Sequence, residues 1–333
     1  MGGGAESPSS QLGCARPILH QHSAPVPLPI DTPGSVVTPG NHDGVHLGHR
    51  ALLAAARAMA DREGLEVVAM TFDPHPATVL APERAPALLT TIERRRELLA
   101  GAGADRVDVV RFDRTFASLS AEEFVETRLA GALRARGVVV GPDFRFGRGR
   151  AGDTETLRVL GRAHGFEVIT VEPVLLDGEV VSSTRVRAML TKGDVRAAAR
   201  LLGRMHDVDG RVVRGDGRGR SIGVPTANLD CDPVLLPKDG VYAVVMKVGS
   251  EILPGVANLG VRPTFAAGRS VEVHLLDVDR DLYDARVRVA FVERLRGEQR
   301  FDGVEALKAQ IARDVSAARA IFAQESRETW RWI

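Results

Sequence analysis

Between residues 35 and 202, short apolar runs alternate with amphipathic stretches. The strand-like runs are 35–38, 66–71, 106–112, 137–140 and 166–171, and the helix-like stretches are 49–62, 92–100 and 153–164. Ser120 begins a further helix, because Glu123 three residues on completes a capping box. Buried strands that alternate with amphipathic helices form βαβ units, so the pattern predicts a parallel sheet covered by helices. Two short helices, 184–190 and 194–202, are expected to close this half.

The pattern changes after Gly203. Strand-like segments at 207–214, 241–248, 255–259, 271–276 and 286–292 are separated by Gly and Pro, which predicts a small antiparallel barrel. A final helix over 304–322 carries apolar residues at helical spacing and is expected to pack on the barrel. The chain therefore divides into a Rossmann-like α/β domain, 35–203, and a β-barrel domain with a C-terminal helix, 204–333. Residues 1–34 are rich in Pro, Gly, Ser and His and are predicted to be a disordered tail.

Composition narrows the functional classes. The 333 residues suffice for two domains, and the formal net charge of +1 argues against a general nucleic-acid or membrane-surface role. No apolar run approaches the ~18 residues that a membrane helix needs. Cys14 and Cys231 lie far apart without metal-ligand spacing, so we interpret them as reduced thiols of a cytoplasmic protein.

The most informative segment is 40–49, Gly-Asn-His-Asp-Gly-Val-His-Leu-Gly-His, which joins the first predicted strand to the first helix. In a parallel sheet this junction lies at the carboxyl edge, and a helix N-terminus there suits phosphate. His46 and His49 are three apart and share a helix face, and Gly48 between them lets a ligand approach the backbone. Two histidines alone would favour a plain helix cap or a solvent-facing pair. The whole segment at this junction favours a triphosphate site.

This segment resembles that of the bacterial bifunctional riboflavin kinase/FMN adenylyltransferase (FAD synthetase) family, within the nucleotidylyltransferase superfamily. Three further stretches resemble family motifs in the expected order: 71–76 (TFDPHP), 141–147 (GPDFRFG) and 182–187 (SSTRVR). The resemblance implies a nucleotidylyltransferase domain that transfers the adenylyl group of ATP to FMN, giving FAD and pyrophosphate with the help of Mg²⁺.

The resemblance also implies roles for single residues. Arg187 presents a planar, permanently charged donor that can grip phosphate in two places, and Ser182 or Ser183 can cap the helix that carries it. His46, His49 and Arg187 are expected to stabilise transition-state charge. The expected nucleotide and phosphate contacts are Gly40, Asn41, Asp43, Gly48, Ser182, Ser183 and Thr184. Asp143 and Phe144 are expected to line the flavin side, although plain core packing explains Phe144 nearly as well.

The barrel half opens with a Gly- and Arg-rich segment. Gly215, Gly217 and Gly219 could form a loop with exposed N–H groups that cradles phosphate, although a flexible hairpin would also explain them. The next stretch, 225–228 (PTAN), resembles the riboflavin kinase signature, which implies that Thr226 and Asn228 hold Mg²⁺. The two are two residues apart, so they face the same side of an extended segment.

Glu272, in 271–275 (VEVHL), matches the Glu-x-His segment of the family. The resemblance assigns it as the general base for the 5′-hydroxyl of riboflavin. Riboflavin, FMN and ATP are then the expected ligands of a monomer or weak oligomer.

Four positions depart from the family pattern. His42 replaces a Phe, Pro39 an aliphatic strand residue, Met205-His206 a Pro-aromatic pair, and Asp284 a Gly. Two alternatives to the bifunctional enzyme therefore stay open. One is a paralogue with an active kinase half and altered nucleotide or flavin specificity in the other half. The second is a non-catalytic flavin- or nucleotide-binding protein.

Overall fold

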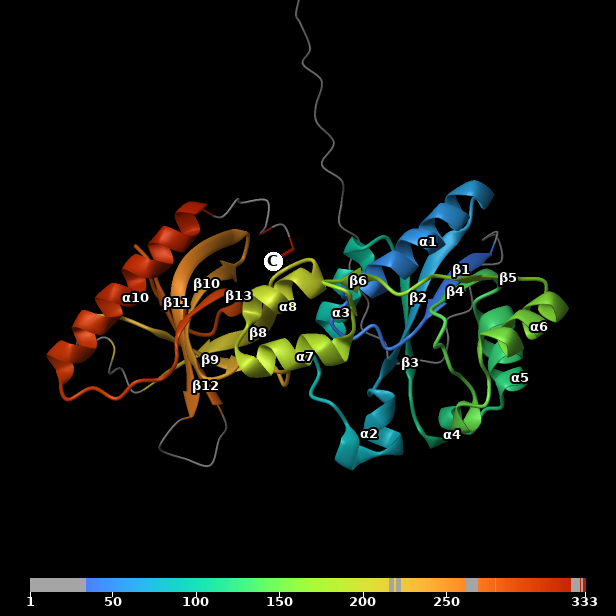
Figure 1. Ribbon diagram of the computed structural model, residues 1–333, viewed down its shortest axis with the longest axis horizontal. Helices are drawn as coiled ribbons and strands as arrows, with labels where there is room; N and C mark the ends of the chain where they lie inside the picture. Colours follow the sequence, from blue (N-terminus) through green and yellow to red (C-terminus); the bar gives the residue numbers. More distant parts are fainter. Residues whose placement is uncertain are drawn as a thin grey trace, which may run out of the picture.

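The protein consists of an α/β half and a barrel half that lie side by side, with two short helices between them (Figure 1). The computed structural model describes residues 34–215, 219, 223–261, 269–278, 280–324, 330, 332 and 333. The predicted disordered tail lies outside this range except for Gly34, and so does Gly217. Within the described residues, no helix is long and apolar enough to cross a membrane.

The α/β half contains the predicted parallel sheet, with strand order β3-β2-β1-β4-β5. Its strands are β1 (Ser35–Pro39), β2 (Glu66–Asp73), β3 (Arg106–Arg111), β4 (Ala135–Val140) and β5 (Glu167–Thr170). Its helices are α1 (Leu47–Glu63), α2 (Pro76–Leu80), α3 (Ile92–Gly101), α4 (Arg114–Ala117), α5 (Ala121–Phe124), the π-helix η2 (Val125–Ala132) and α6 (Thr154–His164), with short 3₁₀ turns η1 (Pro82–Arg84) and η3 (Arg148–Arg150).

The central strands carry runs of buried apolar residues because helices cover both faces of the sheet. Successive residues of β1 enter opposite cores. Val36 packs with α1 and α3, whereas Val37 packs with α5, η2 and α6. The capping box of Ser120 and Glu123 is confirmed at the start of α5.

The barrel half is the predicted antiparallel barrel, closed in the order β10-β11-β12-β9-β8-β13. Its elements are β8 (His206–Val213), β9 (Ala227–Cys231), β10 (Gly240–Val248), β11 (Glu251–Val261), β12 (Arg269–Leu275), β13 (Arg286–Arg296) and α10 (Val304–Gln324). Alternate residues of β10 point inward, as Tyr242 and Val244 do, or outward under α10, as Val241 and Ala243 do. The expectation that the last helix packs on the barrel is thus confirmed.

Some elements escaped the sequence pattern. β9 did not stand out because Leu229 is its one large aliphatic residue. The hairpin of β6 (Leu175–Leu176) and β7 (Glu179–Val180) is too short to show a period.

The two intervening helices, α7 (Ser183–Lys192) and α8 (Val195–Leu202), join the halves. Their apolar faces, which include Val186 and Leu202, share one core with the barrel interior. A buried ion pair crosses the same interface, since Arg94 of α3 donates to both carboxylate oxygens of Asp207 on β8 at 2.9 and 2.8 Å. The α/β half and the barrel half are therefore held together by both apolar and ionic contacts.

Candidate active sites

The first candidate site lies at the carboxyl edge of the parallel sheet. The segment 40–46 follows β1, and the segment 141–144 follows β4, its neighbour in the sheet. From β1 the chain continues to β2 and β3 on one side of β1. It then returns to β4 and β5 on the other side of β1. Such a reversal of strand order is where α/β proteins bind ligands. The two sequence motifs therefore lie where a nucleotide would be expected.

Three imidazoles gather at the start of α1. The rings of His46 and His49 stack with centroids 3.7 Å apart, which confirms that the two share a face. The ring of His42 meets that of His49 edge-on at 5.0 Å. The Nδ1 atoms of all three are buried and have no hydrogen-bond partner among the described residues. Unpaired buried polar atoms are rare unless a ligand or water completes them.

The three histidines are neutral near pH 7. Burial, which disfavours the charged ring, lowers the pKa of His42 and of His46 from 6.5 to about 4. Burial, followed by the nearby His46 and His42, lowers the pKa of His49 well below 6.5. An anionic ligand would oppose this shift by favouring the charged rings.

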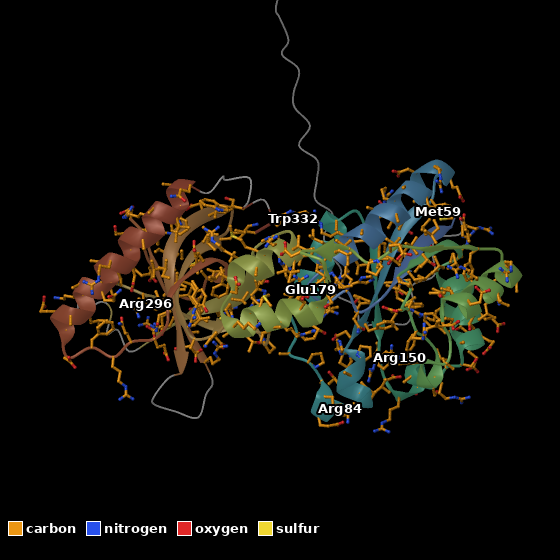
Figure 2. All side chains as sticks on the ribbon, viewed as in Figure 1. Met59, Arg84, Arg150, Glu179, Arg296 and Trp332 are labelled. Atoms are coloured by element: carbon orange, nitrogen blue, oxygen red, sulfur yellow. The ribbon has the colours of Figure 1, made fainter. Side chains whose placement is uncertain are left out.

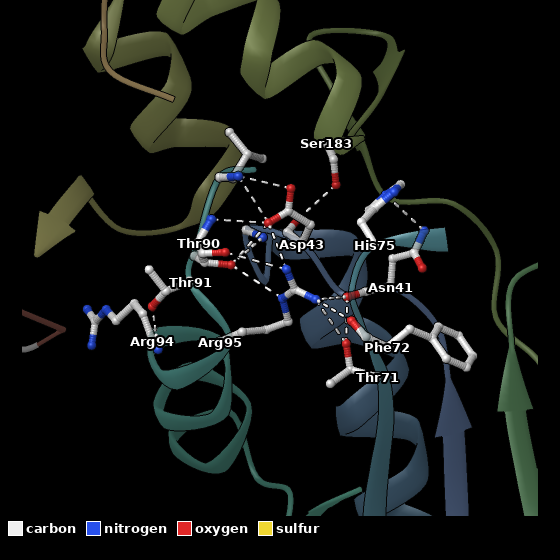
Figure 3. Close-up of polar contacts among 12 residues, drawn as sticks. Asn41, Asp43, Thr71, Phe72, His75, Thr90, Thr91, Arg94, Arg95 and Ser183 are labelled. Carbon is white, nitrogen blue, oxygen red and sulfur yellow. Dashed lines mark hydrogen bonds and ion pairs between the residues drawn. The ribbon is translucent and has the colours of Figure 1, made fainter. Parts of the chain in front are cut away.

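The buried carboxylate of Asp43 is the centre of a hydrogen-bond network at this edge of the sheet (Figure 3). Asp43 accepts hydrogen bonds from the backbone N–H groups of Leu89 and Thr90 at 3.0 to 3.1 Å. Arg187 and Arg95 donate to the same carboxylate. Protein donors therefore surround Asp43 and tie the loop after β1 to the segment before α3 and to α7.

The Ser-Ser-Thr motif begins α7 beside this loop. Ser182 is the N-cap residue, and its side chain accepts from Arg185 N at 3.2 Å. Ser183 Oγ donates to the backbone oxygen of Asp43 at 2.8 Å, and Thr184 is exposed on the first turn. The structure thus joins two motifs separated by about 140 residues in the chain.

The glycines of the first motif make room for imidazoles. A Cβ at Gly40 would lie 3.1 Å from the His42 ring, and one at Gly48 would lie 3.1 Å from the His46 ring. The His46 ring therefore occupies the side of Gly48 on which a Cβ would lie. Asn41 lies at the end of β1, and its backbone oxygen accepts from Thr71 Oγ1 at 2.8 Å.

Asp143 and Phe144 follow β4 at the same edge of the sheet. Asp143 is exposed, and Phe144 is half-buried with its ring stacked on Phe146 at 5.5 Å. Phe144 also packs against the core beneath η2. Both the core-packing role and a ligand-facing edge are thus compatible with its position.

The second candidate site is a cavity of about 150 Å³ in the barrel half. Thr226 and Asn228 both line it, as their spacing predicted, together with Gly215, Asp281 and Tyr283. Gly215 and Gly219, the described glycines of the Gly-rich segment, lie against these two side chains. A Cβ at Gly215 would lie 2.2 Å from Asn228 Nδ2, and one at Gly219 would lie 3.2 Å from Thr226 Oγ1.

Glu272 lies directly across the sheet from Asn228. β12 pairs with β9 so that Glu272 is opposite Asn228, and β11 places Asn258 on the other side of Glu272. Residues directly opposite each other share a face of the sheet, so the Glu272 carboxylate and the Asn228 amide are neighbours. Glu272 is half-buried.

Comparisons with known proteins agree with both sites. A model of the FAD synthetase family matches residues 29–185, and a riboflavin kinase model matches residues 202–322. The bifunctional riboflavin kinase/FMN adenylyltransferase of Escherichia coli is 45% identical over 87% of this chain and 93% of that protein. The protein of the same name from Pseudomonas fluorescens is 45% identical over 87% of this chain and 94% of its own.

The chain belongs to the bifunctional riboflavin kinase/FMN adenylyltransferase family. A crystal structure described as a macrolide-efflux protein from Streptococcus pneumoniae has the same fold, with a TM-score of 0.80 and 33% identity. The match covers 87% of this chain and 95% of that one.

The positions that depart from the family pattern have local explanations. His42 is fully buried with φ 50°, a region that His tolerates better than most residues, and its Nε2 lies 3.0 Å from Thr38 O. Asp284 has φ 62°, in the left-handed region of the backbone. The Gly of the family pattern adopts this conformation without strain, and Asp tolerates it better than most other residues.

The other two departures are also accommodated. Pro39 ends β1, and the next residue, Gly40, donates to Met70 O at 3.0 Å, so the sheet keeps its next hydrogen bond. His206 is buried at the start of β8, with Nε2 2.9 Å from Leu235 O and its ring stacked on Phe291.

Two residues of the first site escaped the sequence analysis. Arg95 is buried on α3 and donates to Asn41 O at 3.1 Å and Thr71 Oγ1 at 3.2 Å (Figure 3). Its signal was a charged residue on the apolar face of a helix, three and four positions before Leu98 and Leu99. His75 lies 3.2 Å from the Asn41 side-chain amide through Nε2. His75 is the N-cap residue of α2. The sequence motif 71–76 contains it, but no spacing of residues indicated its contact with Asn41.

The buried histidines predict acid-sensitive folding. A folded-state pKa near 4 against 6.5 in the unfolded chain means that the unfolded state binds more protons between these values. Stability is then full above pH 6.5 and falls as the pH drops toward 4, by up to about 1.4 kcal/mol per pH unit for each such histidine. Urea denaturation at several pH values above about 5, where carboxylates contribute little, measures this slope. The variant His42→Phe should flatten it, and an unchanged slope would contradict the assignment for His42.

Proposed function

We propose that this chain phosphorylates riboflavin to FMN in its barrel half and transfers the adenylyl group of ATP to FMN in its α/β half. We assign residues 35–203 to the second reaction and 204–333 to the first. Family membership over nearly nine tenths of the chain supports the pair of activities. Two observations support two separate sites. An imidazole cluster lies at the edge of the parallel sheet, and a cavity lined by Thr226, Asn228 and Asp281 lies in the barrel half.

In the α/β half, a phosphate oxygen of FMN would attack the α-phosphorus of ATP while the bond to pyrophosphate breaks. Phosphate is already a competent nucleophile, so positioning and charge stabilisation suffice. His46, His49 and Arg187 would stabilise the growing negative charge. Their support is the stacked imidazole pair and the salt bridge that holds Arg187 against Asp43.

Other residues of this half would hold the two substrates. Ser182, Ser183 and Thr184 begin α7, whose N-terminal end favours phosphate. Gly40, Asn41 and Gly48 would shape the loop beside the phosphates, and Asp143 and Phe144 would face the flavin.

We assign Asp43 a positioning role in place of direct phosphate contact. Its carboxylate already accepts from Leu89, Thr90, Arg95 and Arg187. A second anion at that carboxylate would be repelled, whereas a fixed Arg187 offers its remaining donors to phosphate.

In the barrel half, Glu272 would accept the proton of the riboflavin 5′-hydroxyl as that oxygen attacks the γ-phosphorus of ATP and ADP leaves. Its place opposite Asn228, which lines the cavity, supports this role. Gly215, Gly217 and Gly219 would cradle the phosphates.

The oxygen donors of the cavity fit Mg²⁺. Thr226 and Asn228 offer neutral hard oxygens on one side, and Asp281 adds a carboxylate to the lining. Mg²⁺ prefers oxygen ligands and keeps several waters, so a few protein donors suffice. Thr226 and Asn228 would hold the ion, which would neutralise phosphate charge when bound.

His42 is best explained as a tolerated substitution. Its ring is buried beneath His49 and bound to Thr38 O, where it fills the place of a Phe. A reaction that consumes ATP suits the cytoplasm, and we infer a monomer or weak oligomer there.

The test is to incubate the purified protein with riboflavin, ATP and Mg²⁺ and to separate the flavins by chromatography. FMN followed by FAD is the expected result. FMN without FAD would favour the paralogue with altered specificity in the α/β half, and CTP, GTP and flavin analogues would then be tried. Flavin binding with neither product would favour the non-catalytic alternative.

A further inference from the structure

Trp332 lies between the two halves, near the start of α1 (Figure 2). It follows α10 in sequence and lies beyond residue 322, where the match to the riboflavin kinase model ends. The side chain is half-buried and packs against the core formed by α1, α3 and the sheet. A residue that follows the barrel in sequence thus contributes to the core of the α/β half.

The indole is wedged between two helices of the α/β half. The guanidinium of Arg50 on α1 lies over the ring at 4.9 Å from its centroid, a cation–π contact. At the end of α3, a Cβ on Gly101 would lie 2.8 Å from Trp332 Cζ3, so the ring lies directly against the helix backbone.

The neighbouring residues anchor the same segment to the barrel half. Trp330 packs edge-on against Phe322 of α10. Ile333 is buried in the core between α10 and the barrel, and Lys247 Nζ donates to its backbone oxygen at 2.7 Å. The backbone oxygen of Trp332 accepts from Arg94, which also holds Asp207. These three residues thus contact both halves.

This bridge leads to the imidazole cluster. Arg50 directly follows His49 on α1 and donates to Gly203 O at 3.4 Å. Arg204 donates to Gly44 O at 3.1 Å, and Val45, just before His46, lines a small gap with Arg204 and Trp332. Val45 has φ 43°, an unfavourable value for a β-branched residue, so the surrounding packing must hold it.

We propose that Trp332 is a positioning residue for adenylyl transfer, which fixes the first turn of α1 and hence His46 and His49. The inference rests on the proposed role of these histidines. It means that a segment following the barrel completes the scaffold of the site that makes FAD, and that the α/β half alone would hold that site less well.

The first test compares Trp332→Ala with Trp330→Ala, a matched loss of indole on the barrel side of the bridge. Steady-state kinetics would be measured for FMN formation from riboflavin and for FAD formation from supplied FMN. Trp332→Ala should lower kcat for FAD formation by about 10- to 100-fold, since small displacements of catalytic groups have such costs. The KM for ATP should change little, and FMN formation should be unchanged. Trp332→Phe, which keeps a ring under Arg50, should recover part of the rate.

Wild-type kinetics in Trp332→Ala would overturn the proposal, as would equal losses in both reactions or an equal loss in Trp330→Ala. Absence of FAD formation by the wild-type protein would instead contradict the proposed function itself, independently of the Trp332 variants.

A second variant disturbs the contact between the Trp332 ring and Gly101 without removing the indole. Gly101→Ala places a methyl group against the Trp332 ring, and Ala is otherwise favourable in a helix. It should reproduce the loss in kcat for FAD formation, and adding it to Trp332→Ala should cause no further loss. Wild-type activity in the single variant, or independent losses that multiply in the double variant, would contradict a shared mechanism.

Discussion

Replacing Glu272 with Gln is expected to lower the rate of FMN formation by about 10²- to 10⁴-fold, the usual contribution of a positioned general base. Gln keeps the size of the side chain and its place opposite Asn228 but cannot accept the proton of the hydroxyl. FAD formation from supplied FMN should stay at the wild-type rate, because Glu272 belongs to the barrel and the imidazole cluster to the α/β half. Chromatography of the flavins measures both rates on one protein sample.

The matched control is Glu305→Gln, which makes the same change on the exposed face of α10. Its two rates should equal those of the wild type. A wild-type rate of FMN formation in Glu272→Gln would rule out the carboxylate as the base. Loss of both reactions would mean that the change disturbs folding.

Replacing His46 with Ala is expected to impair FAD formation and to leave FMN formation intact, the reverse of the effect of Glu272→Gln. FAD formation should fall by about 10²- to 10³-fold in kcat, the typical cost of removing one preorganised donor from a developing negative charge. His46 makes no side-chain capping hydrogen bond with the described residues, so the change does not remove a helix cap. FMN formation in the barrel should be unaffected.

His164→Ala serves as the control, because His164 is exposed in the last turn of α6. Its rates should match those of the wild type. Undiminished FAD formation in His46→Ala would contradict the assigned role. A rise in the KM for ATP with unchanged kcat would show that His46 binds ATP without favouring the transition state.

Together these variants would separate the two reactions on one chain. The two halves are nevertheless packed together, because α7 and α8 share a core with the barrel and Arg94 pairs with Asp207. Ser183 and Arg187 lie on α7 itself. Changes at the interface are therefore expected to reach the proposed site of FAD formation without a direct contact with substrate.

The sequence alone determined the two folds and most candidate residues. Strand and helix periods are local, because they reflect the backbone geometry of each element, and so they predicted the parallel sheet and the barrel. The motifs are also local: their spacing alone put His46 beside His49 and made Thr226 and Asn228 line the same cavity.

Only the tertiary structure decided which distant residues meet. Arg95 and Asp43 are 52 positions apart, and their contact depends on how α3 packs beside the loop after β1. Strand register, set by the whole barrel, placed Glu272 opposite Asn228.

The same holds for the two residues to which we assign positioning roles by proposal. Trp332 contacts Arg50 on α1, whereas its neighbour Ile333 is buried between α10 and the barrel. For Asp43 we propose a positioning role in place of the expected direct contact with phosphate, because several donors converge on its buried carboxylate. Such convergence depends on packing between elements far apart in the chain, and no local period encodes it.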